Sequence, residues 1–161
     1  MRKLKTFFQW WSGKPHFSKF MPHVIPHLDR FISRVTGGKT TLTQLMMPMV
    51  VLYAIGAKSG KERATPLAAF PYNEGWIVIG SNFGREKHPA WSGNLLATPD
   101  VWAEPGGGRI AVHAALLEGE ARQTAWDHVL TRWATFAAYD ERTPNREIRV
   151  FHLTPRAEAA A

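Results

Sequence analysis

The sequence contains no cysteine, which excludes disulfide bonds, thiolate metal ligands and a cysteine nucleophile. It also has no hydrophobic run long enough to cross a bilayer. A spanning helix needs about 20 apolar residues, whereas the run over residues 45–57 is shorter and is broken by Pro48. No secretory signal is visible, because Gln9 interrupts the short apolar stretch near the start. These absences predict a cytoplasmic protein whose membrane association, if any, is peripheral.

Acidic residues are scarce relative to basic ones, at 13 against 20, which gives a net charge of +7 and an isoelectric point near 10.1. Such a balance favours an anionic partner, whether a nucleotide-like cofactor, nucleic acid or acidic lipid. The cations are scattered along the chain, and no nucleic-acid-binding motif accompanies them. We therefore predict no nucleic-acid partner.

The 161 residues are enough for one domain with a short extension. We expect three regions: a basic, aromatic N-terminal arm at 1–38, a folded domain at 39–156 and a disordered tail at 157–161. In the arm, Pro26 is expected to open a short helix that ends at the glycines before Lys39. The aromatic stretch of the arm could dock on acidic lipid or pack on the folded domain, and the sequence leaves both readings open.

Two motifs in this first part of the chain resemble a metal site and a phosphate-binding P-loop, but neither is complete. His23 and His27 have the spacing of paired metal ligands on a helix, but Pro26 lies between them and no acidic third ligand is near. The "GGKT" at 37–40 resembles the end of a P-loop, but the required earlier glycine is replaced by Ser33. We therefore expect no metal ion.

Beyond residue 48 the pattern is mainly that of β-strands. Apolar or alternating runs predict six strands, at 49–55, 64–70, 76–81, 101–104, from 109 onward and at 147–155. A short helix is expected after Pro89, and a longer one from about Gln123 to Tyr139. Because few helices lie between the strands, we predict a mostly β protein with flanking helices (α+β) built around a small antiparallel barrel.

The stretch "YAIGAKSGKERATPLAAF" places a loop with two glycines and three cations between two predicted strands. A tight loop with exposed backbone N–H groups, the Ser59 hydroxyl and the charges of Lys58 and Arg63 is a plausible phosphate cradle. The same residues could also be a solvated hairpin tip, and spacing alone favours that second reading.

The loop and the motifs that follow it resemble the deazaflavin-dependent nitroreductase family. The matching motifs run in order from "GAKSGKER" through "TPL", "SNFG", "KHPAW" and "NLLATP", and the final "RVFHLTPR" also matches. The resemblance covers roughly residues 30 to 156. It implies a split β-barrel of the flavin-reductase or FMN-binding type that uses reduced coenzyme F420, a deazaflavin with a phosphate and an oligoglutamate tail. Flavin mononucleotide (FMN) remains the less favoured alternative cofactor.

The resemblance also implies a role for each matching position. The Lys-Ser-Gly loop and its arginine would hold the cofactor phosphate, and the next strand and the Ser-Asn-x-Gly loop would border the deazaflavin ring. The start of the next helix would form the wall of the site. The implied cofactor residues are Lys58, Ser59, Gly60, Arg63, Thr65, Pro66, Leu67, Ser81, Asn82, Phe83, Gly84, Lys87, His88, Ala90, Trp91 and Asn94.

The resemblance implies hydride transfer from the reduced cofactor to a quinone, a nitroaromatic compound or an activated alkene, in a homodimer. Tyrosines before the last strand face the ring in such proteins, and Tyr139 is the only tyrosine in that region here. We therefore take it as the catalytic residue, whereas helical periodicity places Trp133 and Phe136 in the core. A cofactor carrier without turnover would need the same loop, so the sequence leaves that alternative open.

Overall fold

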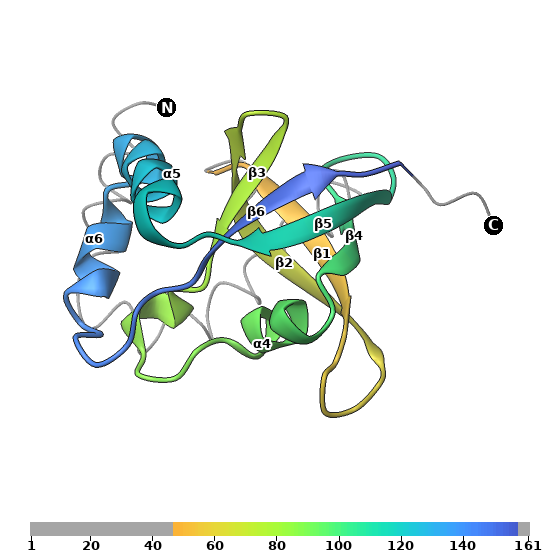
Figure 1. The fold of residues 1–161 in the computed structure, drawn as a ribbon, viewed down its shortest axis with the longest axis horizontal. Coiled ribbons are helices and arrows are strands. Elements are labelled where there is room, and N and C mark those ends of the chain that lie inside the picture. Colours follow the sequence, from red (N-terminus) through yellow and green to blue (C-terminus); the bar gives the residue numbers. More distant parts are fainter. Residues whose placement is uncertain (1–46, 158–161) are drawn as a thin grey trace, which may run out of the picture.

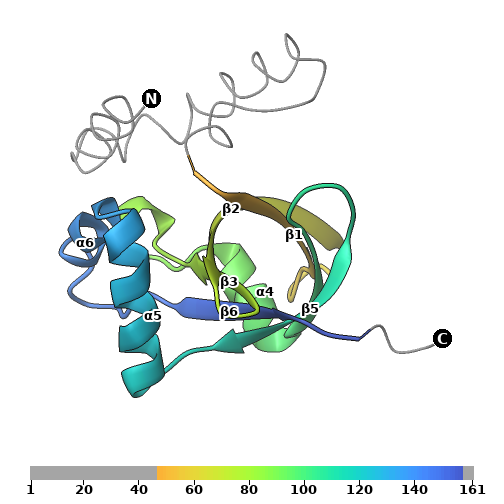
Figure 2. The same cartoon turned by 90° about the horizontal axis from the view of Figure 1, so that it is seen from above.

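The computed structural model describes residues 47–157, and the predicted N-terminal arm with its helix, histidines and "GGKT" motif lies outside them. Six antiparallel strands close into a barrel in the order β1-β2-β3-β6-β5-β4 (Figures 1 and 2). The strands are β1 (Met49–Ile55), β2 (Glu62–Tyr72), β3 (Gly75–Ile79), β4 (Asp100–Glu104), β5 (Ile110–Leu116) and β6 (Val150–Pro155). The prediction of an antiparallel barrel is confirmed, and the fold is that of a split barrel.

Alternation of side chains explains the barrel core. Val50, Leu52 and Ala54 of β1 are buried at every second position, and their neighbours point outward. Across the barrel they meet the inward positions of β4, β5 and β6. Each fully buried aliphatic side chain contributes about 1.5–3 kcal/mol relative to exposure.

Helix α4 (Ala90–Ala97) covers one end of the barrel (Figure 2). Pro89 precedes the first turn, as predicted, because proline tolerates the position where its missing N–H has no partner. Trp91 and Leu95 point from the helix into the barrel core, and the Trp91 ring packs against Phe151 with ring centroids 5.9 Å apart. The helix therefore ties the loops at both of its ends to the barrel.

The second core lies outside the barrel, against β2, β3 and β6. It contains Phe70, Ile77 and Ile79 of the strands together with apolar side chains of α5 (Gly119–Arg132) and α6 (Thr135–Asp140). Figure 1 shows both helices on one side of the barrel. Trp133 and Phe136 are buried in this core, which confirms their predicted place.

The predicted single helix from Gln123 to Tyr139 is wrong in its start and its continuity. Helix α5 begins at Gly119, and the chain leaves helical geometry at Trp133, whose φ and ψ are −148° and 80°. The break lets Trp133 and Phe136 both enter the second core. Among the described residues, no helix combines the length and the apolar character needed to cross a membrane.

Candidate functional site

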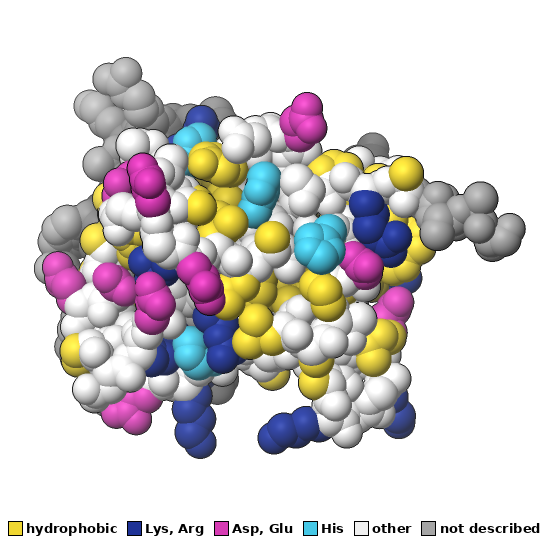
Figure 3. Space-filling model, viewed as in Figure 1, with side chains coloured by type: hydrophobic (Ala, Val, Ile, Leu, Met, Phe, Trp, Pro, Cys, Tyr) yellow, Lys and Arg dark blue, Asp and Glu magenta, His cyan; other side chains and the backbone are white. Residues whose placement is uncertain are grey.

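The cationic loop connects β1 to β2 at one end of the barrel, and basic side chains project from this end of the molecule in Figure 3. Two glycines fit its geometry. Gly60 has a φ of +64°, a conformation that favours glycine. A Cβ on Gly56 would lie 2.5 Å from Ser59 Oγ and 3.3 Å from the Lys61 carbonyl oxygen, so a side chain there would require Ser59 and the loop to shift.

The backbone of this loop is not an open cradle, which corrects the sequence-based expectation. Most of its amide N–H groups already donate hydrogen bonds inside the molecule. The donors are the amides of Gly56, Ala57, Ser59, Gly60 and Lys61. The Ala57 N–H donates to Asn94 Oδ1 of α4 over 3.0 Å. An anion at this loop would therefore be bound by side chains rather than by a row of free amides.

The side chains of Lys58, Lys61 and Arg63 are exposed, and none of them forms an ion pair within residues 47–157. The neighbouring carboxylate of Glu62 is held instead by Arg109, through contacts of 3.1 and 3.2 Å. Because Glu62 is occupied, the three loop cations have no counter-ion in the described part of the chain. The loop thus has the charge that a phosphate-bearing ligand requires.

The predicted strand residues of β2 do not share one face. Thr65 pairs with Leu52 and Leu67 pairs with Val50, so both lie on the inward face of the barrel wall. Pro66 pairs with the outward-facing Val51 and is exposed. Side chains of all three cannot line a single surface, and a ligand on this strand would meet either Pro66 or the other two.

The Ser-Asn-x-Gly loop follows β3 and contains a 3-10 turn, η1 (Asn82–Gly84). Three successive residues have positive φ, namely Asn82 at 48°, Phe83 at 57° and Gly84 at 72°. Positive φ is uncommon for residues other than glycine and costs free energy that the surrounding structure must supply. Asn82 Nδ2 donates to the Lys87 carbonyl over 2.8 Å, which closes the loop onto its own later part.

Arg146 holds this loop from outside, a contact that the sequence analysis missed. Its Nη2 donates to the carbonyls of Ser81 and Arg85, both over 2.7 Å, and its Nε donates to Arg85 over 2.9 Å. Its Nη1 lies 3.4 Å from the Gly80 carbonyl. Arg146 is separated from Ser81 by 65 positions, so no local sequence pattern could have indicated the contact.

The predicted residues at the start of α4 have different surroundings. Asn94 accepts the Ala57 amide and fixes the cationic loop, whereas Trp91 belongs to the barrel core. Ala90 and Lys87 are exposed. Thus α4 lies between the two candidate loops and contacts the first of them through Asn94.

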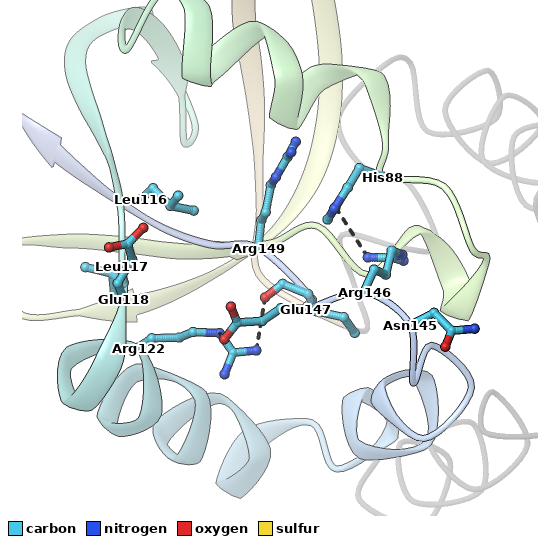
Figure 4. Close-up of a pocket in the computed structure, with 10 residues that line it drawn as sticks. His88, Leu116, Leu117, Glu118, Arg122, Asn145, Arg146, Glu147 and Arg149 are labelled. Carbon is cyan, nitrogen blue, oxygen red and sulfur yellow. Dashed lines mark hydrogen bonds and ion pairs between the residues drawn. The ribbon is translucent and has the colours of Figure 1, made fainter.

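His88 lines a cleft of about 380 Å³ between the loop after β3, the end of β5 and the segment before β6 (Figure 4). Arg146 and Arg149 line the same cleft, and Arg149 donates to Ser92 Oγ over 3.1 Å. Burial, followed by the charges of Arg149 and Arg146, lowers the pKa of His88. In the same segment before β6, Glu147 pairs with Arg122 of α5 at 3.0 Å. Figure 3 shows acidic and basic groups side by side on this face.

Tyr139 lies in the second core and is 5% exposed. Its ring packs edge-on against Phe83 of the Ser-Asn-x-Gly loop, with centroids 6.3 Å apart, and against Phe136 at 5.9 Å. Burial raises the pKa of Tyr139 to about 12, so its hydroxyl keeps its proton at neutral pH. The residue is therefore as buried as Trp133 and Phe136, from which the sequence analysis had separated it.

Comparison with known proteins identifies the family. Residues 28–155 match the model of the F420H(2)-dependent quinone reductase family, which is most of the chain. The chain belongs to this family. Membership makes reduced coenzyme F420 the cofactor and the protein an F420H2-dependent oxidoreductase.

Individual relatives agree with this family. The F420H(2)-dependent quinone reductase Rv1261c of Mycobacterium tuberculosis is 31% identical over 112 residues, which cover 68% of this chain and 74% of the relative. A solved F420-H2 dependent reductase, FDR-A, superposes with a TM-score of 0.60 at 34% identity over 66% of this chain and 93% of that one. A second solved chain, described as a domain-swapped dimer, has a TM-score of 0.61 at 31% identity and covers 83% of this chain and 98% of that one.

The described residues fit such a cofactor. A phosphate and an oligoglutamate tail need cations, and the loop from Ala57 to Arg63 offers three without a counter-ion in the described part of the chain. A heterocyclic ring with carbonyl groups needs hydrogen-bond donors. Within residues 47–157, the amide N–H groups of Ser81, Asn82 and Phe83 have no hydrogen-bond acceptor. Both kinds of donor are present, at the two loops beside α4.

Proposed function

We propose that the protein transfers a hydride from reduced coenzyme F420 to a quinone. Nitroaromatic compounds and activated alkenes are further acceptors for the same reaction, because they also accept a hydride at an electron-poor centre. The observation that carries the proposal is the segment from Ala57 to Arg63, which joins β1 to the start of β2 and whose cations have no counter-ion among the described residues. In a family that uses a polyanionic cofactor, these cations are suited to bind the negative charges of that cofactor.

In this proposal Lys58, Ser59 and Arg63 bind the cofactor phosphate. Arg63 offers a planar pair of donors and Lys58 a single point charge. Asn94 supports them indirectly, because its side chain fixes the loop backbone at Ala57. Gly60 contributes the positive-φ turn between Lys58 and Arg63.

The ring of the cofactor is assigned to the surface between β2 and the Ser-Asn-x-Gly loop. Amides of Ser81 and Asn82 would donate to its pyrimidine edge. The wall of the site is assigned to the residues around the start of α4, namely Lys87, His88, Ala90 and Trp91. Of these, Trp91 acts by packing α4 onto the barrel, because its ring belongs to the core.

When bound, the reduced cofactor supplies a hydride, and a quinone that takes this hydride and one proton becomes a hydroquinone. The protein holds the two partners in contact, from which most of the acceleration is expected. We assign the proton to Tyr139, whose raised pKa keeps the hydroxyl protonated. The phenolate that remains then regains a proton from water.

The test is catalytic oxidation of reduced coenzyme F420 with menadione, followed by the return of the oxidised cofactor's absorbance. We expect many turnovers per protein molecule and hydroquinone in equal amount to the cofactor oxidised. A carrier protein would bind the cofactor but oxidise it no faster than free solution does. An FMN-dependent protein would give turnover only with reduced FMN. Either result would replace the proposed reaction.

We also propose that the protein is a homodimer, an assembly supported by the dimeric description of a solved chain that shares 31% identity. Sedimentation velocity at micromolar concentration should give twice the mass of the 18.1 kDa chain. A single species of monomer mass would remove the dimer and leave the proposed reaction unaffected.

A further inference from the structure

Arg146 contacts one side of the Ser-Asn-x-Gly loop and leaves the other side unpaired. Its guanidinium group reaches the carbonyl oxygens of Gly80, Ser81 and Arg85. The described peptide bonds are all trans. In a planar trans peptide, the C=O of one residue and the N–H of the next point in opposite directions. The amides of Ser81 and Asn82 therefore point away from Arg146.

Those two amides are donors without an acceptor within residues 47–157. Ser81 has right-handed helical angles, with φ −66° and ψ −30°, and Asn82 has a positive φ. This alternation makes successive N–H groups converge on one point, an arrangement that binds oxygen atoms carrying negative charge. The convergence therefore gives this side of the loop the geometry to bind a ligand oxygen.

The contacts of Arg146 lie on both sides of the two strained residues, at Ser81 before them and Arg85 after them. Asn82 and Phe83 both have left-handed backbone angles, which are costly for side-chain-bearing residues. A guanidinium group can bridge three carbonyls, because its five N–H donors lie in one plane with fixed directions. A lysine has the charge but concentrates it on one atom, so it cannot hold the same three oxygens at their separate positions.

We propose that Arg146 is a positioning residue, which fixes the loop so that the Ser81 and Asn82 amides donate to the pyrimidine edge of the cofactor. This inference rests on the proposed function, because that function places the ring at this loop. Arg146 itself does not touch the ring in this account. It acts through the two peptide units whose carbonyls it binds.

The neighbouring Arg149 offers a matched control. It lines the same cleft (Figure 4) and carries the same charge. Its side chain donates to Ser92 of α4 and not to the loop. Loss of Arg149 therefore removes a nearby positive charge and leaves the loop carbonyls bound. Loss of Arg146 removes the charge and the loop contacts together.

The experiment compares Arg146→Met, Arg146→Lys and Arg149→Met with the wild-type protein. Affinity for oxidised coenzyme F420 is measured by fluorescence, and backbone amide resonances are followed by NMR with and without the cofactor.

We expect Arg146→Met to lose affinity at least tenfold and to shift the Asn82 and Phe83 resonances in the cofactor-free protein. Cofactor at saturation should then still shift the amides of residues 57–63 but no longer those of Ser81 and Asn82. Arg146→Lys should keep the stability to urea without recovering the affinity, and Arg149→Met should bind within threefold of wild type.

The proposal is overturned if a folded Arg146→Met protein binds the cofactor within twofold of wild type and keeps the loop resonances. It is also overturned if Arg149→Met loses as much affinity, because the effect would then be one of charge alone. Full recovery by Arg146→Lys, or failure of both Arg146 variants to fold, would make the residue merely structural. Failure of the wild-type protein to bind coenzyme F420 is a separate result, which refutes the proposed function itself.

Discussion

Lys58 and Lys61 lie in the loop between β1 and β2, and Arg63 lies at the start of β2, and we expect unequal roles for these exposed cations. Arg63→Ala and Lys58→Ala should each lower the affinity for coenzyme F420 by about ten- to a hundredfold, which corresponds to about 1.5–3 kcal/mol for a lost charge-assisted hydrogen bond. Lys61→Ala is the matched control and should have a smaller effect, because the resemblance assigns it no phosphate contact. Fluorescence titrations at two salt concentrations measure the affinities, and the differences in affinity between variants and wild type should shrink at high salt.

Equal and near-zero losses for these three variants would leave the loop as a solvated tip. Unfolding in urea should barely distinguish the variants from wild type, since exposed cations that form no ion pair within residues 47–157 contribute little to stability. A large loss of stability in Arg63→Ala would instead make its effect on binding indirect.

At Tyr139 the change to phenylalanine tests the proposed proton donor. Tyr139→Phe should lower the rate of menadione reduction and leave cofactor affinity unchanged, because only the hydroxyl is removed from a ring that packs on Phe83. With a pKa of about 12, the hydroxyl stays protonated from acid to neutral pH. The rate difference between the two proteins should therefore be constant between about pH 6 and 9. An unchanged rate, or weaker cofactor binding at the same rate per complex, would refute the assignment.

At the scale of elements, the strands were predictable and the contacts between distant elements were not. The run "MVVLYAI" predicted a strand at 49–55, and β1 occupies those residues, because alternating apolar side chains fit a barrel wall. The helix break at Trp133 was missed, because a continuous helical pattern hides a bend whose cause is packing on the second core. The loop motifs were found by resemblance, whereas the Arg146 contact needed the fold.

Substitutions of two glycines test how closely β3 and α4 pack against their neighbours. A Cβ on Gly75 of β3 would overlap the carbonyl oxygen of Leu153 in β6, so Gly75→Ala should destabilise the protein by about 1–3 kcal/mol or more. A Cβ on Gly93 of α4 meets no atom of the described residues within 4 Å, and Gly93→Ala should stabilise the fold by about 0.5–1 kcal/mol. Urea unfolding measures both. A neutral Gly75→Ala would contradict the close approach of the two strands.

For the whole molecule, the net charge of +7 suits a polyanionic cofactor and also an acidic membrane surface. The N-terminal arm carries the aromatic stretch that could dock on lipid, and it lies outside the described residues. If it does so, the full chain should co-sediment with anionic vesicles, and a chain that starts near Pro26 should not. Equal sedimentation of both chains would remove the arm as a membrane contact.

The central claim is that the barrel and its two loops form a site for a deazaflavin rather than for another flavin. The direct measurement is a fluorescence titration of the purified full chain with coenzyme F420 and, separately, with FMN. We predict binding of coenzyme F420 at micromolar concentration or tighter and weaker binding of FMN, with competition by FMN only at high concentration. Tighter binding of FMN than of coenzyme F420 would contradict the account.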